Sequence, residues 1–556
     1  MYRMRRTGGN DDASLRASCR QTPSRIERDE RWAERRDSVV RRPRVLDPAG
    51  WRRAAGVVVA VVALAAGGAM ATAPEPFTFD RVIEQATALA ERDYAPALQD
   101  LRPPFADLGY DQYRGIRMRE DRQLWHGENK GFAVDLLPPG FLFQDRVEIA
   151  VVDDGAVVAV PFDAAAYDFD PRMFDPATIA AGEEASSGHM WTGLRLRHAI
   201  NRAEVLDEVV VFHGASYFRA VARGLIYGLS ARGLAIGTGS PQVEEFPAFT
   251  KFWLLAPAPN AGAVTVFALL DSPSVAGAYE FVIHPGLETA MEVRSVLIPR
   301  QAAADVGIAP LTSMYWFAAL EQHRVNDHRG AVHDSDGLAM FTGKGERIWR
   351  PLANPAAVET SIFSDDAPRG FGLVQRARDF AHYLDTEARY NRRPSAWVEP
   401  RGNWGPGAVV LVEIPTRNEF HDNIVAFWRP REPLAPGVAH RFDYRLTWSA
   451  LPPETAALAQ VVASRGGLAV NHPSRRIVTV DFDLGDRSME GLTVEASATR
   501  GAIDEALLVP LPIPQRARVT IHLTPPPDGA AELRLRLLAP DGSAASETWL
   551  YRWVAS

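Results

Sequence analysis

Short runs of alternating apolar and polar residues dominate the chain after residue 145 and predict β-strands. RVEIAVVDDGAVVAVPF, residues 146–162, places two β-branched runs around Asp-Asp-Gly, a combination typical of a β-hairpin. EVVVFHG, AVTVFALLD, YEFVIHPG and AVVLVEIPT are further short runs that end in turn residues. No long alternation of strands and helices appears, which disfavours a parallel α/β fold and predicts an all-β protein.

One segment has a helical pattern instead. Between residues 80 and 100 the apolar residues recur at helical spacing, and one face holds Val82, Ile83, Ala86, Leu89 and Ala90. We therefore expect one amphipathic helix close to the start of the mature protein.

The sequence pattern changes again near residue 430. RPREPLAPGVAH carries three prolines and a glycine, which predicts a linker at residues 430–437. RFDYRLTW, RIVTVDFDLG, RVTIHLTP, AELRLRLLAP and ETWLYRWV follow at roughly ten-residue spacing. This rhythm predicts a small immunoglobulin-like β-sandwich over residues 438–556, after a larger domain over residues 74–429.

Residues 1–73 read as an N-terminal extension with an export signal. Arg52 and Arg53 precede an apolar run over residues 54–71, and small residues around 69–73 offer a cleavage site. A membrane anchor is the alternative, but the run is shorter than the roughly 20 residues that span a bilayer. Export by the twin-arginine or the general secretory route predicts a periplasmic protein without a stable membrane anchor. Cleavage would remove the single cysteine, Cys19.

Charge is distributed unevenly along the chain. Residues 1–53 hold 15 Lys or Arg and 8 Asp or Glu, a net charge of +7, so the rest carries −15 of the total of −8. An acidic body disfavours nucleic acid as a partner and suits a neutral substrate. A homodimer is compatible with the sequence.

Ten motifs between residues 212 and 428 stand together in an order that resembles one family. They are FHGASYFRA (212–220), YGLSARGLA (227–235), EEFPAF (244–249), ALLDSPSVAGAY (268–279), GIAPLTSMYWF (307–317), VHDSDGL (332–338), IWRPLANP (348–355), RGFGLVQRARDF (369–380), RYNRRPSAWVEPRGNWG (389–405) and VEIPTRNEFHDNIVAFW (412–428). From about residue 77 onward the chain resembles the periplasmic glucan biosynthesis proteins of the G and D types, and it is closer to the D type.

The resemblance implies a large mutarotase-like β-supersandwich followed by the immunoglobulin-like sandwich. It also implies action on the β-1,2-linked glucose backbone of osmoregulated periplasmic glucans, as an inverting endo-β-1,2-glucanase without a cofactor. By motif, Asp334 of VHDSDGL corresponds to the general base and Asp422 of HDNIV to the general acid. Tyr390, before NRRP, corresponds to a residue in the proton path.

The residues themselves fit a hydrolytic site but leave other interpretations open. Glycoside hydrolysis uses two carboxyl groups, of which one donates a proton and the other activates water or attacks. Asp334, Asp336 and Asp422 border apolar segments. Because an unpaired charge is costly to bury, an acidic residue in such a place needs a reason other than contact with water. Two alternatives are that these aspartates cap turns or bind calcium. A common calcium loop has Glu at its twelfth position, where this chain, counted from Asp334, has Gly345. We expect His333 and Asp336 to hold Asp334 in position and to contact the substrate.

The aromatic and arginine residues of these motifs also have two interpretations. Tryptophan rings stack on the apolar faces of sugars, but sandwich cores bury them as well. A core position is expected for Trp428, while both interpretations stay open for Trp349, Trp397 and Trp404. Arg350 and Arg393 are candidate donors to sugar hydroxyl groups.

Other catalytic signatures are missing from the sequence. There is no Gly-x-Ser-x-Gly elbow, no P-loop and no Gly-x-Gly-x-x-Gly after a strand, which disfavours a serine hydrolase and nucleotide-driven synthesis. We expect no metal. Two functions remain: an endo-glucanase that trims glucan, and a non-catalytic glucan-binding scaffold.

Overall fold

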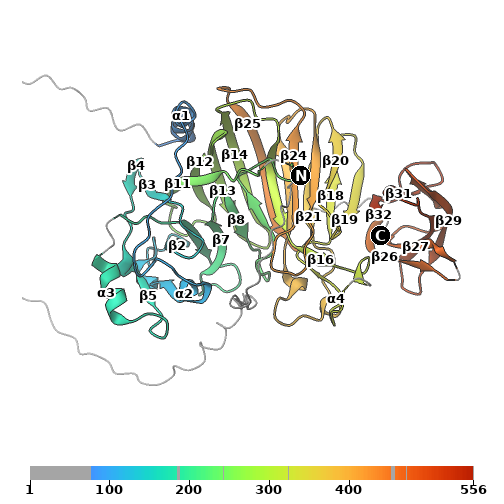
Figure 1. Cartoon of the computed structure of the whole chain (residues 1–556), viewed down its shortest axis with the longest axis horizontal. Helices are drawn as coiled ribbons and strands as arrows, with labels where there is room; N and C mark the ends of the chain where they lie inside the picture. Colours follow the sequence, from blue (N-terminus) through green and yellow to red (C-terminus); the bar gives the residue numbers. More distant parts are fainter. Residues whose placement is uncertain are drawn as a thin grey trace, which may run out of the picture. The chain divides into compact units, whose positions relative to one another are not determined.

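The computed structural model describes residues 77–184, 188–241, 243–322, 325–451, 458–470 and 472–554, and most of its elements are strands (Figure 1). The predicted export segment and Cys19 lie outside the described residues. The helices are α1 (Phe79–Ala90), α2 (Tyr110–Arg114), α3 (Pro176–Glu184) and α4 (Phe380–Tyr383), with single turns η2 (Glu120–Arg122), η3 (Ala164–Ala166) and η5 (Tyr390–Arg392). The predicted β class is confirmed.

The larger of two main sheets has 14 strands. Their order is β28 (Thr493–Ala498), β31 (Ala530–Leu538), β32 (Thr548–Val554), β19 (Arg347–Pro351), β18 (Gly337–Phe341), β21 (Gly370–Val374), β22 (Ser395–Arg401), β25 (His440–Ser449), β14 (Thr289–Pro299), β13 (Val275–His284), β12 (Val264–Asp271), β11 (Ala248–Leu255), β3 (Glu148–Asp153) and β4 (Ala156–Ala159). The pairs β11–β3 and β19–β32 are parallel. The predicted hairpin is β3–β4, whose turn residues Asp154 and Gly155 both have positive φ.

The second main sheet has ten strands and faces the first. Its order is β2 (Phe132–Leu137), β6 (Gly193–His198), β7 (Asp207–His213), β8 (Tyr217–Ala220), β9 (Ser230–Arg232), β15 (Val306–Ser313), β24 (Ile424–Pro430), β23 (Gly407–Glu413) and β20 (Glu359–Asp365), with β10 (Leu234–Ile236) also paired to β15. Phe212 and Phe218 of this sheet contact Phe252, Phe281 and Trp448 of the other. Two short pairs complete the region: β1 (Ile116–Met118) with β5 (Tyr167–Phe169), and β16 (Tyr315–Phe317) with β17 (Val332–His333).

The predicted N-terminal helix is α1, and it packs on the outer face of the 14-stranded sheet. Phe79, Val82 and Ala86 are buried in one cluster with Trp253 and Phe267. The helix ends at Ala90 rather than near residue 100. Pro96 excludes a continuation that far, because it lacks the N–H group that a helix interior needs.

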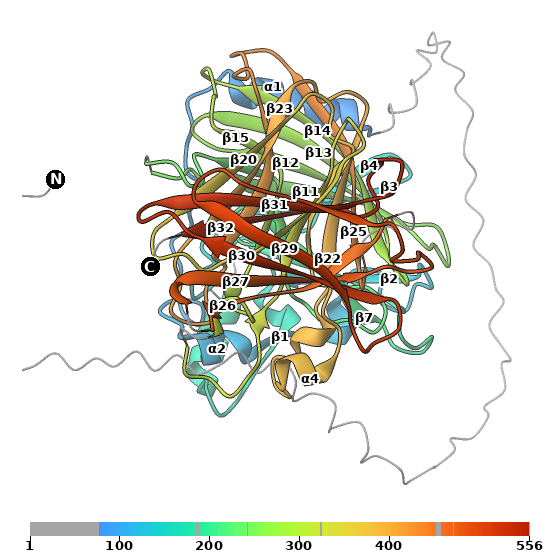
Figure 2. The same ribbon diagram turned by 90° about the vertical axis from the view of Figure 1, so that its right-hand side faces the viewer.

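A smaller sandwich is built from the last seven strands, which are coloured orange to red in Figure 2. One sheet has the order β26 (Gln460–Ala469), β27 (His472–Asp483), β30 (Arg516–Thr524), β29 (Ala502–Pro510). It packs on β28, β31 and β32 through a separate core that includes Val480, Ile521, Leu535 and Trp549.

The strand pairing gives residues 430–437 a different role from the predicted linker between domains. β25, which contains all of RFDYRLTW, lies between β22 and β14 in the 14-stranded sheet and is no part of the small sandwich. Residues 430–437 connect β24 in one main sheet to β25 in the other, which explains their proline and glycine content. The pairing favours a boundary after Ser449, later than the predicted one.

Gly337 gives a direct test of the packing between β18 and β19. A Cβ atom on Gly337 would overlap the indole ring of Trp349. We predict that Gly337→Ala lowers the free energy of unfolding by about 1–3 kcal/mol, since overpacking a closed core costs that much. Gly467→Ala is the matched control, because its strand position has open space. Urea denaturation that shows equal stability for both variants would contradict this packing.

Candidate functional site

The turn that carries the first candidate acid connects β17 to β18 and lies against the end of β15. The backbone N–H of Asp334 donates to the carbonyl oxygen of Met314 at 2.8 Å. One residue further, the hydroxyl groups of Ser335 and Ser313 are 2.9 Å apart. Asp334 is only 3% exposed, so the protein rather than solvent sets the position and charge of its carboxyl group.

The loop before β24 carries Asp422 and is fixed by the next residue, Asn423. The side-chain oxygen of Asn423 accepts from the backbone N–H of Tyr315 at 2.8 Å, and its amide group donates across its own loop at 2.9 Å. Met314 and Tyr315 are consecutive, so the segments that carry Asp334 and Asp422 are bonded to adjacent residues. The structure thus brings these two predicted acids into one region.

Two arginines accompany the two carboxylates. Arg393 Nη1 donates to Asp334 Oδ1 at 2.6 Å, and Arg219 Nη2 lies 3.8 Å from Asp422 Oδ2. Burial raises the pKa of Asp334 to about 6; Arg393 opposes this rise, the charge of Asp422 adds to it, and Arg219 opposes it. Each acid therefore lies within electrostatic reach of the other. The side chain of Asp422 is 31% exposed, so this acid meets solvent.

Tyr390 joins the same cluster through η5. The Arg393 guanidinium lies over its ring, 4.6 Å from the centroid, and its hydroxyl donates to Glu419 Oε2 at 3.0 Å. Burial raises the pKa of this hydroxyl, so Tyr390 is a neutral donor near pH 7. Arg329 in turn donates to Glu419 at 2.6 Å and to Asp385 at 2.8 Å. The predicted residues Asp334, Arg393 and Tyr390 are therefore neighbours.

The sequence prediction missed three charged residues of this cluster: Arg219, Glu419 and Arg329. Arg219 stands near the end of FHGASYFRA and Glu419 in TRNEF, both inside the motifs that carried the resemblance. A charged residue within such a motif was the available signal. Arg329 lies outside every motif, and although it also pairs with Asp327, its partners Asp385 and Glu419 are distant in sequence, so no pattern indicated its place in the cluster.

His333 is a buried, neutral residue bonded to Gln375. Gln375 Nε2 donates to the carbonyl oxygens of His333 and Tyr390 at 2.9 and 3.2 Å, so Gln375 Oε1 faces His333 Nδ1 at 2.9 Å. Nδ1 must then carry the ring proton. Burial lowers the pKa of His333 to about 3, with His382 adding to the effect. Gln375 thereby ties the Asp334 turn to the segment of Tyr390 and Arg393.

Asp336 closes the turn by binding backbone amides. Its carboxylate accepts from the N–H groups of Arg376 and Ala377 at 3.1 Å. The Arg376 side chain continues to Glu547 of the small sandwich, with bonds of 2.5 and 2.9 Å. This arrangement favours the turn-capping interpretation over a calcium site. Within the described residues, no group of three or more His, Cys, Asp or Glu gathers around a space for a metal ion.

The sequence left open whether three tryptophans pack in the core or stack on sugars, and all three are buried. Trp349 and Trp397 belong to the core that underlies the small sandwich, and the Arg376 guanidinium covers the Trp349 ring at 3.6 Å. Trp404 packs in the main core and donates to a backbone carbonyl at 3.1 Å, and Trp428 is buried as expected. These placements favour the core interpretation over sugar stacking.

Arg350 is buried and pairs with an acid other than Asp334 and Asp422. Its Nη2 donates to Glu413 Oε2 at 3.1 Å, and both side chains are fully buried. The Arg350 side chain is only 1% exposed, so a ligand in solvent cannot reach it, and the structure gives no support to Arg350 as a substrate-binding residue.

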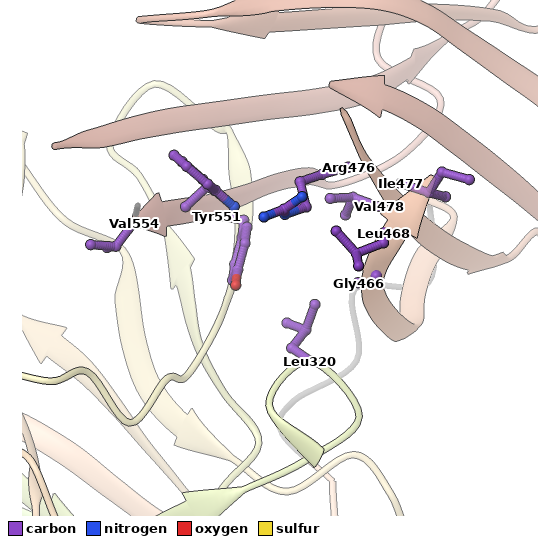
Figure 3. Close-up of a pocket in the computed structure, with 10 residues that line it drawn as sticks. Leu320, Gly466, Leu468, Arg476, Ile477, Val478, Tyr551 and Val554 are labelled. Carbon is purple, nitrogen blue, oxygen red and sulfur yellow. The ribbon is translucent and has the colours of Figure 1, made fainter. Parts of the chain in front are cut away.

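Two of the cavities in and around the small sandwich are also lined by residues of the preceding part of the chain. One of about 470 Å³ is lined mainly by apolar residues of β26, β27 and β32 together with Leu320, and Figure 3 shows them. The other, of about 80 Å³, is lined by His333 and Asp336 on one side and by residues 461–465 on the other. Asp334 and Asp422 line neither cavity.

Comparison with known proteins identifies the family. A family model described as "Periplasmic glucan biosynthesis protein, MdoG" matches residues 77–553. The chain belongs to this family. It is 42% identical to Glucans biosynthesis protein G of Vibrio cholerae serotype O1 (strain ATCC 39541 / Classical Ogawa 395 / O395), 41% to that of Shewanella sp. (strain W3-18-1) and 40% to protein G 1 of Shewanella oneidensis. Each match covers 86% of this chain and 87% of the relative.

The family assignment confirms the resemblance and corrects one detail. These relatives are named protein G, so the predicted closeness to the D type has no support. The family's description places it in the periplasm and in glucan biosynthesis. In the described part of the chain, no helix has the length and apolar character to cross a membrane.

Asn423 tests the anchoring of the Asp422 loop. We predict that Asn423→Ala lowers the free energy of unfolding by about 1–3 kcal/mol, because the buried N–H of Tyr315 loses its partner. Asn418→Ala is the control in the same loop, since its side chain accepts a bond only at an exposed position. Urea denaturation should separate the two variants; an equal loss of stability would contradict the anchoring.

Proposed function

We propose that this protein is a periplasmic endo-β-1,2-glucanase that cuts the glucose backbone of osmoregulated periplasmic glucans with inversion. The observation that carries the proposal is the anchoring of Asp334 and of Asn423, the neighbour of Asp422, to the consecutive residues Met314 and Tyr315, with one acid buried and the other exposed. An acid and a base that act on one glycosidic bond need two carboxyl groups in different surroundings. Trimming a glucan is compatible with a family named for its biosynthesis.

Asp334 is the proposed general base. A pKa of about 6 leaves it ionised near neutral pH, yet more basic than an ordinary aspartate. Arg393, bonded to Oδ1, orients the carboxylate and leaves Oδ2 to accept a proton from water. His333 and Asp336 position the turn, and the Tyr390 hydroxyl supplies a hydrogen-bonding group beside it.

Asp422 is the proposed general acid. Its exposed carboxyl group is open to a polysaccharide, whereas Asp334 is not. A glucan lying over Asp422 would bring a glycosidic oxygen within reach of proton transfer from this carboxyl group. Arg219 beside it would then stabilise the carboxylate that remains after proton transfer.

The finer assignments of fold, export and stereochemistry belong to the same proposal. Two facing main sheets support a mutarotase-like supersandwich, and seven strands in two packed layers support an immunoglobulin-like domain. Residues 50–75 would direct export to the periplasm. Inversion would release the α-anomer first, which proton NMR of the initial product distinguishes from the β-anomer.

A second candidate function is a non-catalytic glucan-binding scaffold. The observation that favours it is the burial of Asp334, one of whose oxygens is already bonded to Arg393. A scaffold would bind glucan without using either acid in chemistry.

Hydrolysis of linear β-1,2-glucan separates the two functions. We predict that the unmodified protein releases new reducing ends, and that Asp422→Asn lowers this rate by at least about a hundredfold, as expected for loss of an acid catalyst. Binding of glucan should change little. Asp504→Asn is the matched control: this aspartate is 30% exposed and lies 3.4 Å from Arg475, but in the small sandwich. An unmodified protein that binds the glucan and leaves it uncut would establish the scaffold instead.

The pH dependence tests the role of Asp334. Because the base must be ionised, kcat/KM should fall as the pH drops below about 6. Arg393 stabilises the ionised form, so Arg393→Gln should move this acidic limb to higher pH, by roughly one unit. Asp504→Asn should leave the limb in place. A limb that Arg393→Gln does not move, or moves to lower pH, would exclude Asp334 as the titrating base.

A further inference from the structure

An exposed aromatic ring lies beside the outer face of the ten-stranded sheet. Phe246 is 53% exposed, and its ring faces the guanidinium of Arg232, 5.7 Å from the centroid. On its other side Arg232 covers the ring of Tyr217 at 4.6 Å. Tyr217 and Arg232 are directly paired across β8 and β9. The three side chains therefore form a ladder of ring, cation and ring.

The centre of this ladder is rigid. Arg232 donates through Nε to Thr312 Oγ1 at 2.9 Å and through Nη1 to Glu244 Oε1 at 2.7 Å. The same oxygen of Glu244 also accepts from Thr238 at 2.5 Å. A buried arginine with fixed partners holds the exposed phenyl ring in one place, so a ligand that stacks there meets a preorganised surface.

The ladder begins beside the proposed acid. Arg219 follows Tyr217 by two residues on β8, so both side chains project from one face of the strand. Arg219 donates to Ser230 of β9 at 2.7 Å and reaches Asp422 with its guanidinium. Burial raises the pKa of Tyr217, and the charges of Glu244 and Asp422 add to this rise, which places Tyr217 within electrostatic reach of the acid.

We infer that Phe246, backed by Arg232 and Tyr217, is a stacking subsite for a glucose ring of the β-1,2-glucan, beyond the ring that contacts Asp422. A phenyl ring without polar atoms suits the C–H face of a neutral sugar. The inference rests on the proposed glucan substrate and adds a binding position to it. It also gives a role to EEFPAF, a motif that the two acids leave unexplained.

Binding of linear β-1,2-gluco-oligosaccharides of increasing length, measured by calorimetry, tests the subsite. Phe246→Ala should weaken binding of long oligosaccharides about tenfold, as expected for loss of a stacking contact, and should leave the shortest ligands unaffected. Phe246→Trp should retain binding. Tyr110→Ala is the matched control, because Tyr110 is 40% exposed and also lies beside an arginine, Arg114, at 5.6 Å.

The outcomes separate this inference from the proposed hydrolysis. Unchanged binding by Phe246→Ala, or an equal loss in Tyr110→Ala, would overturn the subsite even if the protein cuts glucan. Length-dependent weakening with recovery in Phe246→Trp would support the subsite even if no cleavage occurs. An unmodified protein that binds none of these oligosaccharides would overturn both.

Discussion

The main chain of Met314 and Tyr315 is the constraint on which the site depends. The carbonyl oxygen of Met314 accepts from Asp334, and the N–H of Tyr315 donates to Asn423, the neighbour of Asp422. Both bonds are buried, where an unpaired backbone group would cost about 1–3 kcal/mol. The end of β15 therefore fixes the two acid loops relative to each other, one through a backbone–backbone bond and the other through the buried side chain of Asn423.

Neighbouring residues offset the electrostatic cost of burying Asp334. Arg393 pairs with it directly, and Gln375 holds the backbone segments that carry the two residues together. The small sandwich contributes as well. The backbone N–H of Arg376 donates to Asp336 in the turn, and its side chain donates to Glu547, which directly precedes β32. A domain that contains none of the proposed catalytic residues thus supports the turn on which one of them lies.

The sequence predicted the elements better than their connections. Alternating residues identified strands such as β3 and β4, since half-buried strands must alternate. The sheet to which a strand belongs depends on long-range pairing, so β25 was assigned to the wrong sandwich. Burial of the tryptophans was equally open, although Gly337 and Gly372 in adjacent strands leave space that the rings of Trp349 and Trp397 fill. Among the site residues, motifs indicated both acids, Tyr390 and Arg393. Arg219 and Glu419 also lie in motifs but were passed over, and the pairing of Arg329 with Glu419 and Asp385 depends on distant segments.

A crystal structure of the Asp422→Asn variant with a linear β-1,2-gluco-oligosaccharide tests the central claim most directly. The account predicts a glycosidic oxygen beside residue 422 and a water between the anomeric carbon and Asp334, with the two side chains about 6.5–9.5 Å apart, as inversion requires. A glucan bound elsewhere, such as in the cavity of the small sandwich, or one whose glycosidic bonds all lie away from both acids, would contradict it.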